Sequence, residues 1–224
     1  MRENKHILSK GKQFAFVVDG ECECWYIQML KRNEQSVNID LKPEIPQKKG
    51  IAEQYNKVVE LAYDYDKVFW IVDFDVIIRE TRAAKKGATA LLQEFKVYYN
   101  ELKLCINVEV IINNPCLEYW YLLHFKTTNR YFESCDKLVK QLKKHLTEYE
   151  KTRKFYTQKN HDIYLQLKPY LNQAISNAEK LGEFNFDNAQ LSGISEMQKF
   201  FNEEEVKKRL VCGSKSGQQS RFPY

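Results

Sequence analysis

The 224-residue sequence has few of the residues that mark disordered, fibrous or disulfide-dense proteins, with 8 glycines, 5 prolines and 6 cysteines. Its 43% hydrophobic and 13% aromatic residues are typical of an ordinary globular chain. A chain of this length can bury a sizeable core as one domain with an added subdomain. We therefore expect a folded globular protein.

The sequence has no apolar run close to the roughly 20 residues that a membrane-spanning helix needs. Residues 1–12 also lack the apolar core of a signal peptide. We therefore expect a soluble protein of the cytoplasm, with no membrane partner.

Cysteine pairs of the C-x-x-C kind are absent as well. A zinc site at Cys22 and Cys24 would need two further soft ligands at a suitable spacing, and the sequence offers only isolated cysteines and four histidines. We expect no zinc site there, and we expect reduced thiols at Cys22, Cys24, Cys105, Cys116, Cys135 and Cys212.

The net charge of +5, from 35 Lys and Arg against 30 Asp and Glu, permits nucleic-acid binding but does not single it out. A Walker A motif is absent, so a nucleoside triphosphate motor would have to come from a partner. The sequence also shows no helix-turn-helix or zinc-finger pattern, so base-specific readout is not expected.

Apolar periodicity predicts alternating strands and helices in the first half of the chain. The predicted strands are residues 13–18, 37–42, 67–73 and 105–112, and the predicted helices are residues 23–32, 51–65, 85–104 and 116–125. Such alternation favours an α/β fold, with a mostly parallel sheet flanked by helices.

The second half of the chain has a charged, helical pattern. We expect helices over residues 134–148, 161–181 and 194–210. The polar, Gly- and Ser-containing end is expected to be flexible. The predicted division is a core of residues 1–128, a helical C-terminal part of residues 129–212, and a tail of residues 213–224.

Acidic residues follow three of the predicted strands. Parallel strands end at one edge of a sheet, so acids at their carboxyl ends lie close together. Hard oxygen ligands of this kind suit Mg²⁺ or Mn²⁺. Asp73 and Asp75 should point to the same side if the strand stays extended through them. The candidate metal ligands are Asp19, Glu21, Glu23, Asp73 and Asp75.

An alternative is that each acid only caps a turn or a helix start. For one cluster alone that explanation is the stronger one. For the clusters together a functional site is favoured, because a buried strand end gains nothing from adjacent acids unless something neutralises them.

Three motifs follow one another along the chain: DGECECWY after the first predicted strand, then VFWIVDFDV, then NNPCLEYWYLLHF. In this order they resemble the motifs of the RloB family, which are E-G-E-T-E-x-x-Y, a D-x-D strand and S/N-N-P-x-F-E-x-W-x-x-x-H-F. The resemblance covers residues 13 to 125.

The resemblance implies a Toprim-like fold and a nuclease-like site that binds magnesium. Carried over by motif, the catalytic acids are Asp19, Glu23, Asp73, Asp75 and Glu118, with His124 as a possible accessory residue. Asp19 stands where the family usually has Glu, which sets its carboxylate one methylene further back. With the shorter side chain, either a water molecule bridges Asp19 and the metal, or the metal is bound more weakly at this position.

His124 lies almost two helical turns after Glu118, so the two can share a helix face. The stronger reading of a lone histidine among aromatic residues is a hydrogen-bonded core residue. Two basic segments with aromatic residues, 137–145 and 150–160, could follow a phosphate backbone or could be solvated helix faces.

These observations favour a metal-dependent nuclease acting on RNA, including tRNA, or DNA, with Mg²⁺ or Mn²⁺ as cofactor. The resemblance further implies an effector of bacterial antiphage defence and abortive infection, with an ABC-type or AAA-type ATPase as a possible partner. The alternative is a non-catalytic subunit that keeps the fold and regulates such an ATPase.

Overall fold

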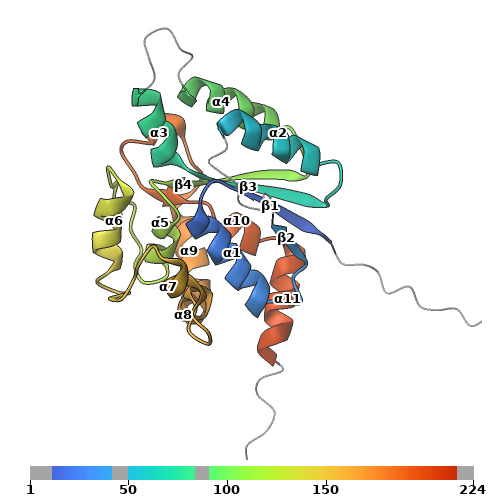
Figure 1. The fold of residues 1–224 in the computed structure, drawn as a ribbon, viewed down its shortest axis with the longest axis vertical. Coiled ribbons are helices and arrows are strands. Elements are labelled where there is room, and N and C mark those ends of the chain that lie inside the picture. The colour runs from blue at the N-terminus through green and yellow to red at the C-terminus, as the bar shows by residue number, and fades with distance from the viewer. Residues whose placement is uncertain (1–11, 42–49, 84–90, 216–224) are drawn as a thin grey trace, which may run out of the picture.

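A computed structural model of the protein describes residues 12–41, 50–83 and 91–215. Its centre is a five-stranded sheet in the order β2-β1-β3-β4-β5 (Figure 1). The strands are β1 (Phe14–Val18), β2 (Ile39–Leu41), β3 (Lys67–Asp73), β4 (Val108–Asn114) and β5 (Ile194–Ser195). The first four strands pair in parallel, and β5 runs antiparallel to β4. The predicted α/β fold with a mostly parallel sheet is confirmed.

Helices cover both faces of the sheet (Figure 1). One face carries α2 (Ile51–Leu61), α3 (Phe74–Ala83) and α4 (Leu91–Leu102). The other carries α1 (Glu21–Asn33), α5 (Glu118–Leu123) and the C-terminal helices. The C-terminal helices are α6 (Cys135–Leu142), α7 (Arg153–Thr157), α8 (Ile163–Leu167), α9 (Leu171–Leu181), α10 (Gln198–Phe201) and α11 (Glu204–Lys215), with the 3₁₀ turn η1 (Lys168–Tyr170). A second 3₁₀ turn, η2 (Phe186–Asn188), lies on the side of α3 and α4, where Phe186 packs against Phe74 and Phe95.

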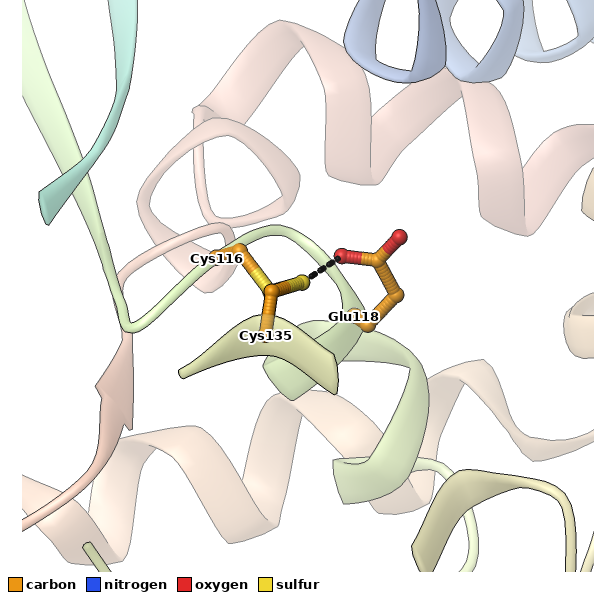
Figure 2. Close-up of side chains that lie close together, drawn as sticks. All are labelled: Cys116, Glu118 and Cys135. Atoms are coloured by element: carbon orange, nitrogen blue, oxygen red, sulfur yellow. Dashed lines mark hydrogen bonds between the residues drawn. A yellow bond between two sulfur atoms is a disulfide. The ribbon is translucent and has the colours of Figure 1, made fainter. Parts of the chain in front are cut away.

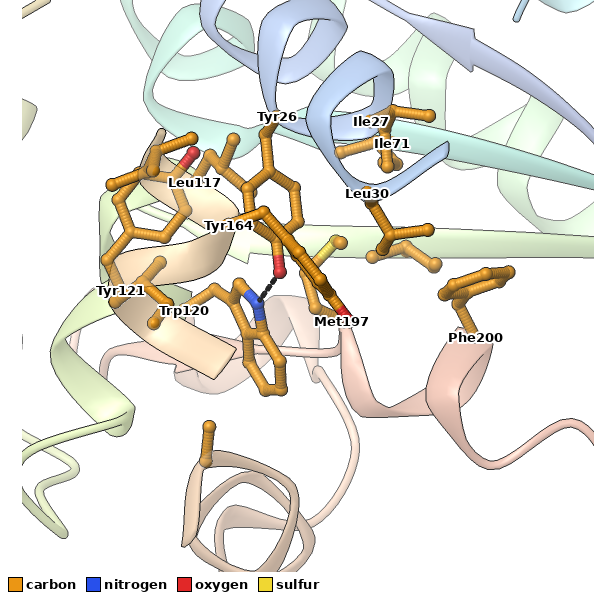
Figure 3. Packing of buried hydrophobic residues seen from close by; sticks show 14 of the residues in the cluster. Tyr26, Ile27, Leu30, Ile71, Leu117, Trp120, Tyr121, Tyr164, Met197 and Phe200 are labelled. Atoms are coloured by element: carbon orange, nitrogen blue, oxygen red, sulfur yellow. Dashed lines mark hydrogen bonds between the residues drawn. The ribbon is translucent and has the colours of Figure 1, made fainter. Parts of the chain in front are cut away.

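Strand side chains alternate between two hydrophobic layers. Phe69 and Ile71 face α1 and α5, whereas Trp70 and Val72 face α2, α3 and α4. Because both layers are buried, the strands are almost continuously apolar in sequence. In the layer under α1, the Trp120 indole N–H donates to the Tyr26 hydroxyl at 2.9 Å (Figure 3). The pair joins α1 to α5.

The position of Asp75 differs from the prediction. Strand β3 ends at Asp73, and the chain enters α3 at Phe74, so Asp75 lies in the first helical turn and not in an extended segment. Its backbone N–H donates to the Pro115 carbonyl at 3.0 Å, which ties the start of α3 to the chain after β4. The sequence prediction had placed no helix over residues 74–83.

The C-terminal part also departs from the predicted helices. Residues 194–210 form β5, α10 and part of α11 instead of one helix. The segment pairs with β4 because its polar side chains satisfy buried groups of that strand: the Ser195 hydroxyl donates to Asn113 Oδ1 at 2.7 Å, and the Ile112 N–H donates to Glu196 Oε2 at 3.1 Å. The spacing of apolar residues, from which one helix was predicted over residues 194–210, gives no information about such tertiary partners.

The remaining predicted helices are shorter or longer than expected. The helix predicted over 161–181 is divided into α8 and α9 around η1, which contains Pro169. Only α6 forms within residues 134–148. Helix α11 continues through Lys215, past the predicted start of the tail, and residues 216–224 lie outside the described ranges.

The expectation of six reduced thiols is wrong for two of them. Cys116 and Cys135 are joined by a disulfide, because α5 and α6 pack together and bring the two residues to a Cα–Cα distance of 5.8 Å. Cys22, Cys24 and Cys105 are free. The side chain of Cys212 lies outside the described part of the structure.

Within the described ranges, no helix is both long enough and apolar enough to cross a membrane.

We expect Glu196→Ala to lower the free energy of unfolding by about 2–5 kcal/mol. Glu196 is fully buried and accepts backbone N–H groups from Ile112 and Phe184 at 3.1 and 3.0 Å, and these donors would lose their acceptor. The measurement is urea denaturation followed by circular dichroism. Glu204→Ala, which removes an exposed carboxylate paired with Lys208, is the control and should leave the stability close to that of wild type. Equal stability of the two variants would contradict the role given to Glu196.

Candidate metal centre

Acidic side chains meet where the parallel strands end. Asp19 follows β1, Asp73 is the last residue of β3, and Glu118 opens α5 just after β4. The first turns of α1 and α3 add Glu23 and Asp75. We refer to Asp19, Glu23, Asp73, Asp75 and Glu118 as the carboxylate cluster. The parallel order of β1, β3 and β4 places the cluster at one edge of the sheet.

Asp19 is held by the core beneath it. The Trp70 indole N–H donates to Gln54 Oε1 at 2.9 Å, and Gln54 Nε2 donates to Asp19 Oδ1 at 2.8 Å. Burial raises the pKa of Asp19, and the hydrogen bond from Gln54 opposes that rise. The strand-borne Trp70 thereby fixes the orientation of this carboxylate.

Glu23 is buried, with 4% of its surface exposed. Its carboxylate lies against Gly20, where an added Cβ would come within 2.5 Å of Glu23 Oε2. Any side chain at position 20 would therefore push the Glu23 carboxylate aside. Burial, and next the charge of Glu118, raise the pKa of Glu23 to about 7.

Asp73 and Asp75 are partly exposed. Asp73 Oδ1 accepts the Leu117 N–H at 2.9 Å, which links the end of β3 to the start of α5. Burial, followed by the charges of Glu23 and Glu118, raises the pKa of Asp73 well above its usual value. Burial also raises the pKa of Asp75, against a hydrogen bond from the Cys135 backbone.

Glu118 has the most complete set of partners in the cluster. Its Oε1 accepts the Tyr149 hydroxyl at 2.5 Å and pairs with Lys151 Nζ at 2.8 Å. Tyr149 and Tyr156 exchange a further hydrogen bond at 2.6 Å. Burial lowers the pKa of Lys151, but the pairing with Glu118 raises it, and the net direction is upward. Lys151 therefore brings a positive charge to the cluster.

Sequence reasoning did not single out Lys151. It lies in the basic segment 150–160, which was considered only as a possible phosphate-binding surface. No sequence spacing connects Lys151 with Glu118, because the packing of α5 against the following segments decides their contact.

Two predicted site residues are not part of the carboxylate cluster. Glu21 is exposed in the first turn of α1, so its part in a metal site stays a prediction. His124 is 1% exposed among aromatic residues, with Nδ1 at 2.9 Å from the Trp120 carbonyl. Burial lowers the pKa of His124 to about 4, so it is a neutral core residue at pH 7. This agrees with the core role that the sequence favoured.

A cavity of about 290 Å³ opens beside Asp75. Arg79 and Arg82 of α3 line it together with residues that precede α6. A second, more open cavity of about 420 Å³ shares Tyr131, Phe132 and Glu133 with the first. It is lined further by Arg130, Lys137, Lys140, Gln141 and Lys144, and we name it the basic groove. A cationic surface thus continues from the edge of the carboxylate cluster.

The carboxylate cluster suits Mg²⁺ or Mn²⁺ by its chemistry, since its donors are hard carboxylate oxygens. The charge of Glu118 raises the pKa of Glu23 and of Asp73, so a divalent cation would relieve the repulsion between these acids. Among the described residues, no three of these carboxylates bring ligand atoms within 4.8 Å of one another. A hydrated Mg²⁺ fits such spacing, because it is usually held by one or two carboxylates and keeps several waters.

The parallel sheet, the acids at its carboxyl edge and the helical C-terminal part define an α/β protein with a candidate metal centre. A family model described as RloB-like protein matches residues 14–203. The chain therefore belongs to the RloB-like family, as the sequence motifs suggested. No curated protein and no solved structure matches the chain.

We expect the stability of the metal-free protein to depend on Glu23 between pH 4.5 and 7. Its pKa is raised from 4.5 to about 7 on folding, so the folded state binds this proton more tightly. The resulting stabilisation is present below about pH 4.5 and is lost as the pH rises to about 7. Across this window, wild type should lose on the order of 2 kcal/mol more than Glu23→Gln.

Urea denaturation at a series of pH values measures this difference. Glu21→Gln removes the exposed neighbouring carboxylate and should keep the wild-type dependence. The same slope in wild type and Glu23→Gln would show that Glu23 does not titrate in this range.

Proposed function

We propose that this chain is a Mg²⁺- or Mn²⁺-dependent phosphodiesterase that cleaves nucleic acid. One observation carries the proposal: acids from three strand ends meet at one edge of the sheet, beside an arginine-lined cavity that continues into the basic groove. Metal-dependent phosphodiester hydrolysis needs both parts, acids for the cation and cations for the phosphates.

Asp73 and Asp75 would hold the metal from the end of β3 and the start of α3, with Asp19 and Glu23 completing its surroundings. When bound, the metal supplies an activated water and stabilises charge on the phosphate. Leu117 and Gln54 keep Asp73 and Asp19 oriented by hydrogen bonds. Lys151 holds Glu118 in place and offsets part of the negative charge.

Arg79 and Arg82 are suited to bind the phosphate next to Asp75. From there, Lys140 and Lys144 in the basic groove can follow the phosphate backbone. These lysines belong to the segment 137–145, one of the two basic segments noted in the sequence. The groove presents no base-reading motif, so RNA, including tRNA, and DNA both remain substrates to test.

The biological role is a proposal that rests on the RloB resemblance. It comprises an effector function in antiphage defence and abortive infection, with an ABC-type or AAA-type ATPase as partner. The alternative, a non-catalytic subunit of that ATPase, is supported by Asp19 in place of the usual Glu. The two functions differ in whether metal-dependent cleavage occurs.

We expect Asp73→Asn to lower the rate of metal-dependent cleavage of nucleic acid at least about 100-fold. Asparagine removes the charge but keeps an oxygen that can accept the Leu117 N–H, so the fold is preserved. The measurement is cleavage of total RNA and of plasmid DNA with Mg²⁺ or Mn²⁺, alongside calorimetric titration of Mn²⁺. Asp64→Asn, at an exposed turn before β3, is the matched control and should cleave as wild type.

Cleavage that survives in Asp73→Asn would exclude the proposed metal centre. If wild type neither binds Mn²⁺ nor cleaves either substrate, the non-catalytic subunit becomes the better explanation.

We expect the double variant Lys140→Ala/Lys144→Ala to bind nucleic acid less tightly and with a weaker salt dependence, by about one unit of slope for each lost phosphate contact. Both lysines line the basic groove. The double variant Lys143→Ala/Lys207→Ala serves as the control, because it removes equal charge from exposed positions outside the groove lining. Fluorescence anisotropy at several salt concentrations measures the slopes, and equal slopes for the two double variants would exclude the groove as the binding surface.

A further inference from the structure

A second group of potential metal ligands lies beside the carboxylate cluster. The sulfurs of Cys116 and Cys135 and a carboxylate oxygen of Glu118 lie within 4.8 Å of one another (Figure 2). Cys116 comes from the turn after β4, Glu118 from the start of α5, and Cys135 from the start of α6. Two sulfurs with one carboxylate are a borderline-soft donor set, which suits Zn²⁺ better than Mg²⁺.

In the disulfide form, the close contact between Cys135 Sγ and Glu118 Oε2 has no proton between the two atoms. Cys135 Sγ lies 2.9 Å from Glu118 Oε2, and a disulfide sulfur has no hydrogen to donate. Glu118 Oε1 is already occupied by Tyr149 and Lys151, whereas Oε2 faces the sulfurs. The contact would become favourable with a thiol proton or a metal ion between sulfur and oxygen.

Lys151 places a positive charge beside Glu118 and Cys135. Its Nζ lies 2.8 Å from Glu118 Oε1 and 3.1 Å from Cys135 Sγ, so one ammonium group bridges the carboxylate and the sulfur. A neighbouring ammonium group favours the thiolate form of a reduced cysteine. Two thiolates and Glu118 carry three negative charges, which one Zn²⁺ and Lys151 balance.

We propose that Cys116, Cys135 and Glu118 form a Zn²⁺ site when the disulfide between the two cysteines is reduced. A dithiol reductant supplies two electrons and two protons, which break the S–S bond and give two thiols while the dithiol becomes its own disulfide. Zn²⁺ then displaces both thiol protons to solvent and forms two Zn–S bonds. Water takes the fourth position from the partly exposed side of Cys135.

The dimensions of the site fit this assignment. Zn–S bonds of about 2.3 Å and Zn–O bonds of about 2.1 Å place tetrahedral ligand atoms roughly 3.5–3.8 Å apart. The three ligand atoms already lie within 4.8 Å of one another. After reduction, the two sulfurs have to separate and the distance of 2.9 Å between Cys135 Sγ and Glu118 Oε2 has to lengthen slightly. The two oxidation states are therefore alternatives at one place: a disulfide, or a zinc thiolate site.

The test uses Co²⁺ as a spectroscopic probe for Zn²⁺. The full chain is reduced with a water-soluble phosphine, freed of it without air, and titrated with Co²⁺. We expect one equivalent to produce a thiolate-to-cobalt charge-transfer band, and one equivalent of Zn²⁺ to remove it. The oxidised protein should give no such band, and this comparison requires no variant.

Variants then assign the ligands. Cys116→Ser and Cys135→Ser should each weaken Zn²⁺ binding about 100-fold or more, measured against a chromophoric chelator. Cys105→Ser, at an exposed free cysteine, is the matched control and should bind Zn²⁺ as wild type. A reduced wild type without the charge-transfer band, or a band that persists in both ligand variants, would overturn the zinc site.

The zinc site does not rest on the proposed nuclease function, and the experiments separate the two. Asp73→Asn lacks a carboxylate proposed for Mg²⁺ but keeps both sulfurs, so it should retain the cobalt charge-transfer band. Loss of the band in Asp73→Asn would show that sulfur ligation depends on the carboxylate cluster and would count against an independent zinc site.

Discussion

The burial of α5 against the sheet is the constraint on which the site depends. Residues 111–124 are all buried, and α5 packs on α6, α9, β4 and β5. Trp120 joins this helix to α1 by its hydrogen bond to Tyr26, and Asp73 joins it to β3 by accepting the Leu117 N–H. Because α5 is held from all these sides, Glu118 stays among the strand ends, where its charge acts on Glu23 and Asp73.

A cluster of acids in a buried place costs free energy that the fold must offset. The pKa values of Asp19, Glu23, Asp73 and Asp75 are all raised, chiefly by burial. Trp70 and Gln54 hold the Asp19 carboxylate, and the Glu23 carboxylate packs closely against Gly20. Acids that repel one another and are held firmly in place are expected at a cation-binding site. The packing of the chain alone would not require such a group of acids.

Glu118 belongs to two groups with different chemistry. Toward the strand ends it is one of several hard oxygen donors, and toward α6 it faces the sulfurs of Cys116 and Cys135. Lys151 touches both the carboxylate and Cys135. Any change in the oxidation state or metal content of the sulfur pair therefore alters the charge next to the carboxylate cluster. The two groups share Glu118, and Lys151 contacts both Glu118 and Cys135.

The sequence by itself determined the α/β class, the succession of the first four strands along the chain, and the acids that follow them, because apolar strands covered on both faces and turn acids are local patterns. The order of the strands in the sheet was not predicted. Only the tertiary structure decided the rest. The antiparallel strand β5 forms because Ser195 and Glu196 satisfy buried groups near β4, and Asp75 turned out to be helical. Lys151 and the Cys116–Cys135 pair meet Glu118 through helix packing across intervals of chain that carry no periodic signal.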